Sequence, residues 1–111
     1  MPDPWNVPVS GTQSRPAALP FFVLGRNNLN PRVTVDDAGV TVKVVGTTRL
    51  TFGQISKAET HKGLRSIYVT LSGGSWEYLI HFRDEGALKE FLSRLSAGGV
   101  ALGPDAQKRL A

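Results

Sequence analysis

Histidine, serine and carboxylate side chains are the groups in this sequence that could carry out catalysis or bind a metal. His61 and His81 are the only histidines, and no spaced set of histidines and carboxylates accompanies them as a metal site requires. Ser75 follows two glycines, which a tight turn explains, and no Gly-x-Ser-x-Gly nucleophile elbow occurs. Neither a phosphate-binding glycine loop nor a dinucleotide fingerprint is present. The sequence therefore predicts a protein that is not an enzyme and that binds neither a metal nor another cofactor.

Composition narrows the class of protein further. With 111 residues and no cysteine, the chain has room for one domain and cannot form disulfides or thiolate sites. No apolar run approaches the roughly 20 residues that span a bilayer. The N-terminus also lacks the basic start and apolar core of a signal peptide. We therefore expect a cytoplasmic, single-domain protein.

Positive charge is concentrated in one segment. Against a net charge of +4 for the whole chain, residues 43–65 contain one acidic residue, Glu59, and five basic ones: Lys43, Arg49, Lys57, Lys62 and Arg65. If these side chains share a face, that face could attract nucleic acid phosphates or anionic lipid. Nucleic-acid-binding surfaces usually interleave exposed aromatic rings, and the only nearby ring is Phe52, which shares an inward face with Leu50. The alternative is an ordinary solvated polar face.

The most regular part of the sequence is residues 66–95. Apolar and polar residues alternate on both sides of a turn at residues 72–75, the period of two that gives a strand one buried face. His81 is expected on the face opposite to the aromatic residues of its strand. After Arg83 the apolar spacing becomes helical, with Asp84 as the N-cap and Gly98 and Gly99 as the stop. The helical stripe consists of Leu88, Phe91, Leu92 and Leu95.

A second hairpin is predicted over residues 32–44. Valines alternate along both of its strands, and the turn between them ends at Gly39, which we expect to adopt a positive φ. Further along, Gly53 separates two short strand-like pieces, residues 49–52 and 54–60. A glycine at such a point indicates a bulge or sharp bend by which the chain passes from one sheet to another.

The two ends of the chain are expected to lie outside the main fold. Four prolines in the first 16 residues predict an extended arm over residues 1–18 that forms neither a helix nor an interior strand. Residues 19–24 are a dense apolar run expected to form the first strand, with Pro20 placing it at a strand start or a sheet edge. Residues 100–111 are expected to form a C-terminal tail.

This order of elements resembles the pleckstrin-homology-like (PH-like) fold, and the chain looks most like the small bacterial members of that superfamily. The resemblance is carried by residues 32–42, by residues 50–55, and by residues 80–82 leading into the helical stripe. It implies a mainly β fold, α+β by content, with one C-terminal helix. In that fold about seven antiparallel strands form two near-orthogonal sheets, a partly open barrel, here over residues 19–99.

Members of this superfamily bind phosphoinositide head groups, peptides or copies of themselves, and they are rarely enzymes. Lipid-binding members carry a lysine and then a basic pair, one residue apart, on the first hairpin loop. Here the corresponding loop offers Arg26 and Arg32, but the residue two beyond Arg32 is Thr34. The lipid motif is therefore incomplete, and the resemblance points to a binding module without identifying its ligand.

Protein–protein interaction, above all self-association, is the function that the sequence favours. Trp5 is a large apolar ring in a proline-rich arm. Phe21 and Phe22 are expected at a sheet edge, which is a template for another chain. Trp5 either folds back onto its own domain or docks onto a neighbouring subunit. Electrostatic binding of an anionic membrane surface or nucleic acid through residues 43–65 is the alternative function, and no small-molecule substrate is indicated.

Overall fold

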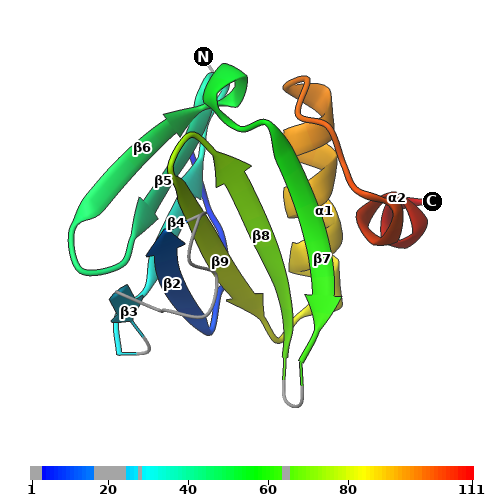
Figure 1. The fold of residues 1–111 in the computed structure, drawn as a ribbon. Coiled ribbons are helices and arrows are strands. Elements are labelled where there is room, and N and C mark those ends of the chain that lie inside the picture. The colour runs from blue at the N-terminus through cyan, green and yellow to red at the C-terminus, as the bar shows by residue number, and fades with distance from the viewer. Residues whose placement is uncertain (1–3, 17–24, 28, 64–65) are drawn as a thin grey trace.

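The computed structural model describes residues 4–16, 25–27, 29–63 and 66–111, and within these ranges the fold is mainly β. Two antiparallel sheets are present, as predicted, but they are accompanied by two short helices instead of one (Figure 1). The four-stranded sheet has the order β1 (Trp5–Asn6), β4 (Arg32–Val35), β5 (Gly39–Lys43) and β6 (Thr47–Thr51). The five-stranded sheet has the order β3 (Gly25–Asn27), β2 (Gly11–Pro16), β9 (Trp76–Phe82), β8 (Ile67–Gly73) and β7 (Lys57–Lys62).

Both predicted hairpins are confirmed. In β8–β9, Ile67 pairs with Phe82 and Gly73 with Trp76, and Gly74 provides the turn with a φ of +63°. In β4–β5, Val33 pairs with Val42 and the alternating valines of both strands are buried. Trp76 departs from the predicted pattern, because it is 41% exposed at the end of the hairpin. The period of two therefore located the strands, but Thr70 and Leu79 on the opposite face are buried as well.

The N-terminal segment contributes to both sheets, so the prediction that it forms no interior strand is wrong. β1 pairs with β4 in the first sheet, and β2 lies between β9 and β3 in the second. The prolines do not prevent this, because Pro8 falls between β1 and β2 and Pro16 ends β2. Both the apolar run at residues 19–24, predicted to be a strand, and the predicted boundary after residue 18 lie outside the described residues.

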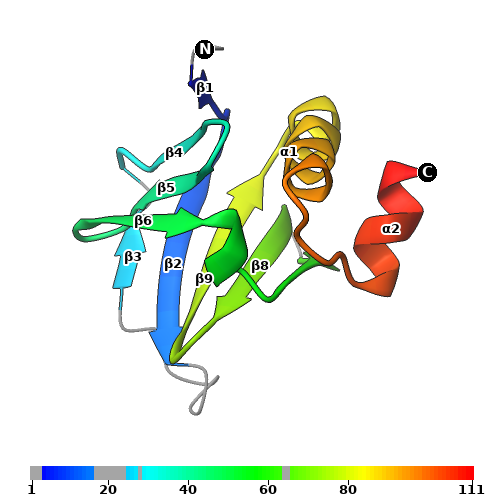
Figure 2. The same ribbon diagram turned by 90° about the horizontal axis from the view of Figure 1, so that it is seen from above.

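The chain changes sheet between β1 and β2 and between β3 and β4, and it does so again where a bend was expected at Gly53. The connection is a turn of 3₁₀ helix, η1 (Phe52–Gln54), which joins β6 of one sheet to β7 of the other (Figure 2). A buried hydrogen bond from Thr12 Oγ1 to the Lys43 carbonyl oxygen, 2.6 Å long, ties β2 to the end of β5. The two sheets are not closed into a barrel among the described strands.

Helix α1 (Glu85–Ala97) buries the predicted stripe against the sheets. Leu88, Phe91, Leu92 and Leu95 are each at most 1% exposed, and the Phe91 ring centroid lies 5.4 Å from that of Phe82 on β9. Asp84 caps the helix as predicted, since its carboxylate accepts a 2.8 Å hydrogen bond from the Gly86 amide. Gly98 and Gly99 end the helix, and Gly99 has a φ of +92°.

A second helix, α2 (Pro104–Leu110), occupies the segment predicted to be a tail. The preceding residues pair with the free edge of β7, where the Ala58 amide donates to the Ala101 carbonyl and the Gly103 amide to the Ala58 carbonyl. The Glu59 carboxylate then accepts from the Ala106 amide in the first turn of α2. These tertiary contacts compensate for the shortness of the helix, which alone would be only marginally stable.

No helix in the described ranges is long and apolar enough to cross a membrane.

Gly39 does not have the positive φ expected for it, because only Gly74 and Gly99 have one among the described residues. Gly39 is instead required by a close backbone approach from β6. A Cβ atom on Gly39 would overlap the Leu50 carbonyl oxygen and lie 2.8 Å from the Thr51 Cα. The sequence pattern identified the correct residue for the turn but the wrong physical reason for it.

Candidate functional site

The basic residues of segment 43–65 are distributed over different parts of the molecule. Lys43 and Arg49 are on the outward face of the four-stranded sheet, whereas Lys57 and Lys62 are on β7 in the other sheet. Lys57 and Lys62 are also five positions apart on one strand, so they alternate to opposite faces. Arg65 lies outside the described residues. Among the described residues, the fold therefore does not gather this charge into one patch.

Arg49 is engaged within its own sheet. Its guanidinium donates to both carboxylate oxygens of Asp36, at 2.6 and 2.9 Å, and the same carboxylate accepts from the amides of Ala38 and Gly39. The hydrogen bonds from Arg49 and from these amides hold the pKa of Asp36 well below its usual range. This arrangement closes the β4–β5 turn, so Arg49 has a structural partner there.

The lowered pKa of Asp36 predicts that the fold loses stability in acid. A carboxyl group whose pKa is lower in the folded state stabilises the fold above its unfolded pKa, about 4, and this contribution is lost as pH falls toward the folded value. We expect Asp36→Asn, which keeps the turn acceptor but removes the charge, to lower stability at pH 7 by about 1 kcal/mol or less. Below pH 4 the free energy of unfolding of Asp36→Asn should then fall less steeply than that of the wild type.

Urea unfolding followed by circular dichroism between pH 2 and pH 7 measures this effect. Asp37→Asn is the matched control, because the neighbouring Asp37 side chain is exposed and belongs to no ion pair among the described residues. Equal slopes for wild type and Asp36→Asn below pH 4 would contradict the assigned role of the Asp36 charge.

Of the aromatic residues predicted to bind a partner, Trp5 is among the described residues and the two phenylalanines are not. Trp5 packs against the hydrophobic core of its own chain, and the Arg94 guanidinium carbon lies 4.8 Å from its ring centroid, a cation–π geometry. Trp5 therefore folds back onto its own domain, which is the first of the two alternatives. Phe21 and Phe22 lie outside the described residues, so their predicted role stays a prediction.

The two histidines flank Tyr68 on the outer face of the five-stranded sheet. The Tyr68 ring centroid lies 5.2 Å from that of His61 and 5.2 Å from that of His81. His81 points away from the core, as predicted, and its Nδ1 lies 3.1 Å from Ser66 Oγ. Burial, together with the nearby charge of Arg26, lowers the pKa of His81 and favours the neutral ring.

The contact between Ser66 and His81 is one that sequence reasoning missed. A hydroxyl beside an imidazole is the nucleophile–base pair of a catalytic triad, which also needs a third group to orient the base. Among the described residues no carboxylate hydrogen-bonds the His81 ring. The contact would follow from the hairpin register, because Tyr68 pairs with His81 and Ser66 is the next residue on the same face.

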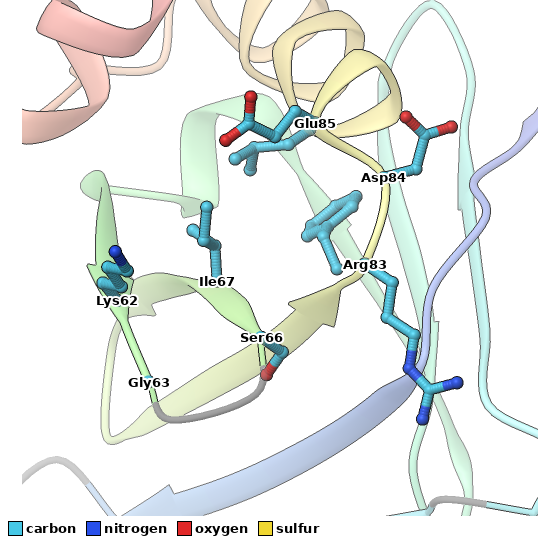
Figure 3. A pocket seen from close by; sticks show the side chains of 9 residues that line it. Lys62, Gly63, Ser66, Ile67, Arg83, Asp84 and Glu85 are labelled. Atoms are coloured by element: carbon cyan, nitrogen blue, oxygen red, sulfur yellow. The ribbon is translucent and has the colours of Figure 1, made fainter.

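A cavity of about 490 Å³ opens between the β7–β8 hairpin and the first turn of α1 (Figure 3). Its floor is apolar and consists of Ile67, Phe82 and Leu88, of which the last two are buried core residues. The rest of its lining is contributed by Lys62, Gly63, Ser66, Arg83, Asp84 and Glu85. The volume lies within the range of pockets that hold small molecules or side chains.

Charged side chains of both signs surround this apolar floor. Lys62 and Glu85 lie on opposite sides of Ile67, while Arg83 and Asp84 point outward from the strand-to-helix junction (Figure 3). None of these four side chains forms an ion pair within the described chain. An apolar centre within a polar rim is the arrangement of a protein-binding surface.

Secondary structure holds the cavity in a defined shape. The Phe82–Phe91 contact fixes the floor on one side, and the Asp84 cap fixes the start of α1 on the other. At the hairpin, the Gly63 amide donates a 2.8 Å hydrogen bond to the Ser66 carbonyl oxygen. A ligand would therefore meet a site that is already formed, which reduces the entropic cost of binding.

Two comparisons, with protein-family models and with curated proteins, find no match for this chain. Among the described residues no group of three or more His, Cys, Asp or Glu side chains converges to hold a metal ion. The cavity and the residues around it are therefore the features that point to a function.

Proposed function

We propose that this chain is a non-catalytic, PH-like interaction module that binds a protein segment in the cavity beside α1. The observation that carries this proposal is the apolar floor of Ile67, Phe82 and Leu88 within a rim of charged side chains that form no ion pair among the described residues. An apolar side chain of the partner would fill the centre, while its flanking polar residues meet the rim. We expect this binding to take place in the cytoplasm.

The PH-like assignment is supported by the order and the placement of the elements. The antiparallel hairpins are followed by helix α1, whose apolar stripe is buried against the sheets, and then by the short helix α2. The chain crosses from sheet to sheet at residues 7–10 and again at η1, as expected for a partly open barrel made of two near-orthogonal sheets. Binding modules of many kinds share such scaffolds, so the ligand has to be argued from the cavity and not from the fold.

Selection from a random peptide library displayed on phage tests the proposal. We expect the wild-type protein to enrich peptides with one large apolar residue between charged residues, because these match the floor and the rim. Ile67→Arg, which places a charged side chain over the floor, should weaken binding of the selected peptides at least tenfold, measured by fluorescence polarisation. Such a loss is typical when a buried apolar contact is replaced by an unpaired charge.

Lys43→Ala is the matched control, since it removes a charge on the other sheet and should leave peptide affinity unchanged. Enrichment of no peptide, or equal affinity of wild type and a folded Ile67→Arg variant, would rule out the cavity as the binding surface. Glu85 is exposed, so Glu85→Arg provides a second variant, which changes the charge of the rim and leaves the apolar floor unaltered.

A further inference from the structure

Leu29 is the most exposed large hydrophobic side chain of the described residues. It is 99% exposed, compared with 80% for Val45 and 41% for Trp76. It lies in the loop between β3 and β4, where a lone exposed leucine needs no explanation unless its surroundings hold it in place.

The loop around Leu29 is held by the side chain of Asn27. The Asn27 Oδ1 atom accepts hydrogen bonds from the amides of Leu29 and Asn30, at 3.2 and 3.0 Å. Its Nδ2 atom donates to the Val44 carbonyl oxygen at 2.9 Å and so ties the loop to the end of β5. Leu29 is therefore presented to solvent from a hydrogen-bonded loop, which lowers the entropy lost when it binds.

The cavity cannot be filled by Leu29 of the same chain. β3 forms one edge of the five-stranded sheet and β7 the other, with three strands between them. At about 4.8 Å per strand spacing these edges are roughly 19 Å apart. Figure 1 shows β2 and β9 lying between β3 and the β7–β8 hairpin.

The charges beside Leu29 complement those on the helix side of the cavity. Arg26 and Arg32 flank the loop and are exposed, and residues 25–32 contain no acidic side chain. Glu85 extends over the cavity floor, whereas the Asp84 carboxylate points away from Glu85 and caps α1 (Figure 3). Lys62, on the hairpin side of the cavity, carries the opposite charge. Opposite charges arranged in this way favour one orientation of a contact and disfavour others.

From these observations we propose that the partner is a second copy of this chain, whose Leu29 inserts into the cavity and packs on Ile67, Phe82 and Leu88. Arg26 and Arg32 of that copy then face Asp84 and Glu85. This inference rests on the proposed function, because it uses the same cavity. The two surfaces differ, so the contact is head-to-tail, and copies join in a ring or an open chain.

Sedimentation equilibrium of the full chain over a wide concentration range tests this contact. One side chain and its loop form a small interface, so we expect weak association that becomes visible at high concentration. Leu29→Asn should lower the association constant at least tenfold, while Val45→Thr, a change at the second exposed aliphatic residue, should leave it unchanged. Because Leu29 is exposed, its replacement is not expected to affect folding.

Mixing two variants gives a sharper test of the head-to-tail geometry. Leu29→Asn keeps an intact cavity and Ile67→Arg keeps an intact Leu29, so each variant alone should be monomeric. Their equimolar mixture should form a heterodimer that grows no further, because only one matched pair of surfaces remains. Glu85→Arg takes the place of Ile67→Arg if circular dichroism shows that the latter is unfolded.

Three results would overturn the inference. These are a monomeric wild type at the highest concentration, an equal effect of Val45→Thr and Leu29→Asn, or a mixture that stays monomeric. If the cavity still selects peptides in any of these cases, only self-recognition fails. If the library selection also fails, the proposed function fails with it.

Discussion

Replacing Phe91 with alanine is expected to destabilise the fold by about 3–5 kcal/mol, the typical cost of truncating a buried phenylalanine. The Phe91 side chain is fully buried and contacts the Phe82 ring from β9, so its removal leaves a cavity where the helix meets the sheet. Single domains are stable by only 5–15 kcal/mol, so a large share of the total would be lost. Urea unfolding followed by circular dichroism measures the change.

Ser93→Ala is the matched control on the same helix, because Ser93 is exposed. We expect its effect to stay within about 0.5 kcal/mol, as for most surface substitutions. If Phe91→Ala lowers the free energy of unfolding by less than about 1 kcal/mol, α1 does not hold the sheets together in the way that the buried stripe indicates.

The parts of the fold that could be predicted are those in which local pattern and tertiary burial agree. The alternation in residues 67–82 has a single interpretation, and the helical spacing from Leu88 to Leu95 has caps at both ends. The helical stripe is fully buried, and so are the central inward residues of the hairpin, whereas Ile67 and Tyr78 are partly buried and Trp76 is exposed. Agreement between local and tertiary preferences is expected of sequences with a single stable fold.

Strand β2 and helix α2 are among the elements that could not be predicted, because their stability comes from distant parts of the chain. β2 is composed largely of residues with weak strand preference, and it exists because it pairs with β9 on one side and β3 on the other. Helix α2 is only seven residues long and depends on the Glu59 carboxylate and on the contact between Thr60 and Asp105. Neither set of partners can be identified from local spacing.

The candidate site was missed for the same reason. Its floor combines Ile67 from β8, Phe82 from β9 and Leu88 from α1, all of which were predicted to face the core. Whether such residues also line an open cavity depends on how the helix docks at the end of the hairpin, which the sequence pattern does not specify. The basic segment was conspicuous in the sequence, but the sheets separate its described members.

Gly39→Ala is expected to destabilise the fold by about 1–3 kcal/mol, the usual cost of inserting a group into a filled space. The new Cβ atom would overlap the Leu50 carbonyl oxygen and crowd the Thr51 Cα atom on β6. Both neighbours are backbone atoms of a paired strand, so they cannot move without disturbing the β5–β6 ladder. The substitution therefore tests close approach as the reason for glycine at this position, since φ is not positive there.

Gly46→Ala provides the matched control at the other end of the same hairpin. An added Cβ atom at Gly46 meets nothing within 4 Å, and its φ is not positive. Replacing this glycine with alanine lowers the conformational entropy of the unfolded chain. We therefore expect the free energy of unfolding to rise by about 0.4–1 kcal/mol. Thermal unfolding should thus shift in opposite directions for the two variants. A neutral effect of Gly39→Ala would show that β6 lies farther from β5 at this point, and the packing of Leu50 against the core would need to be revised with it.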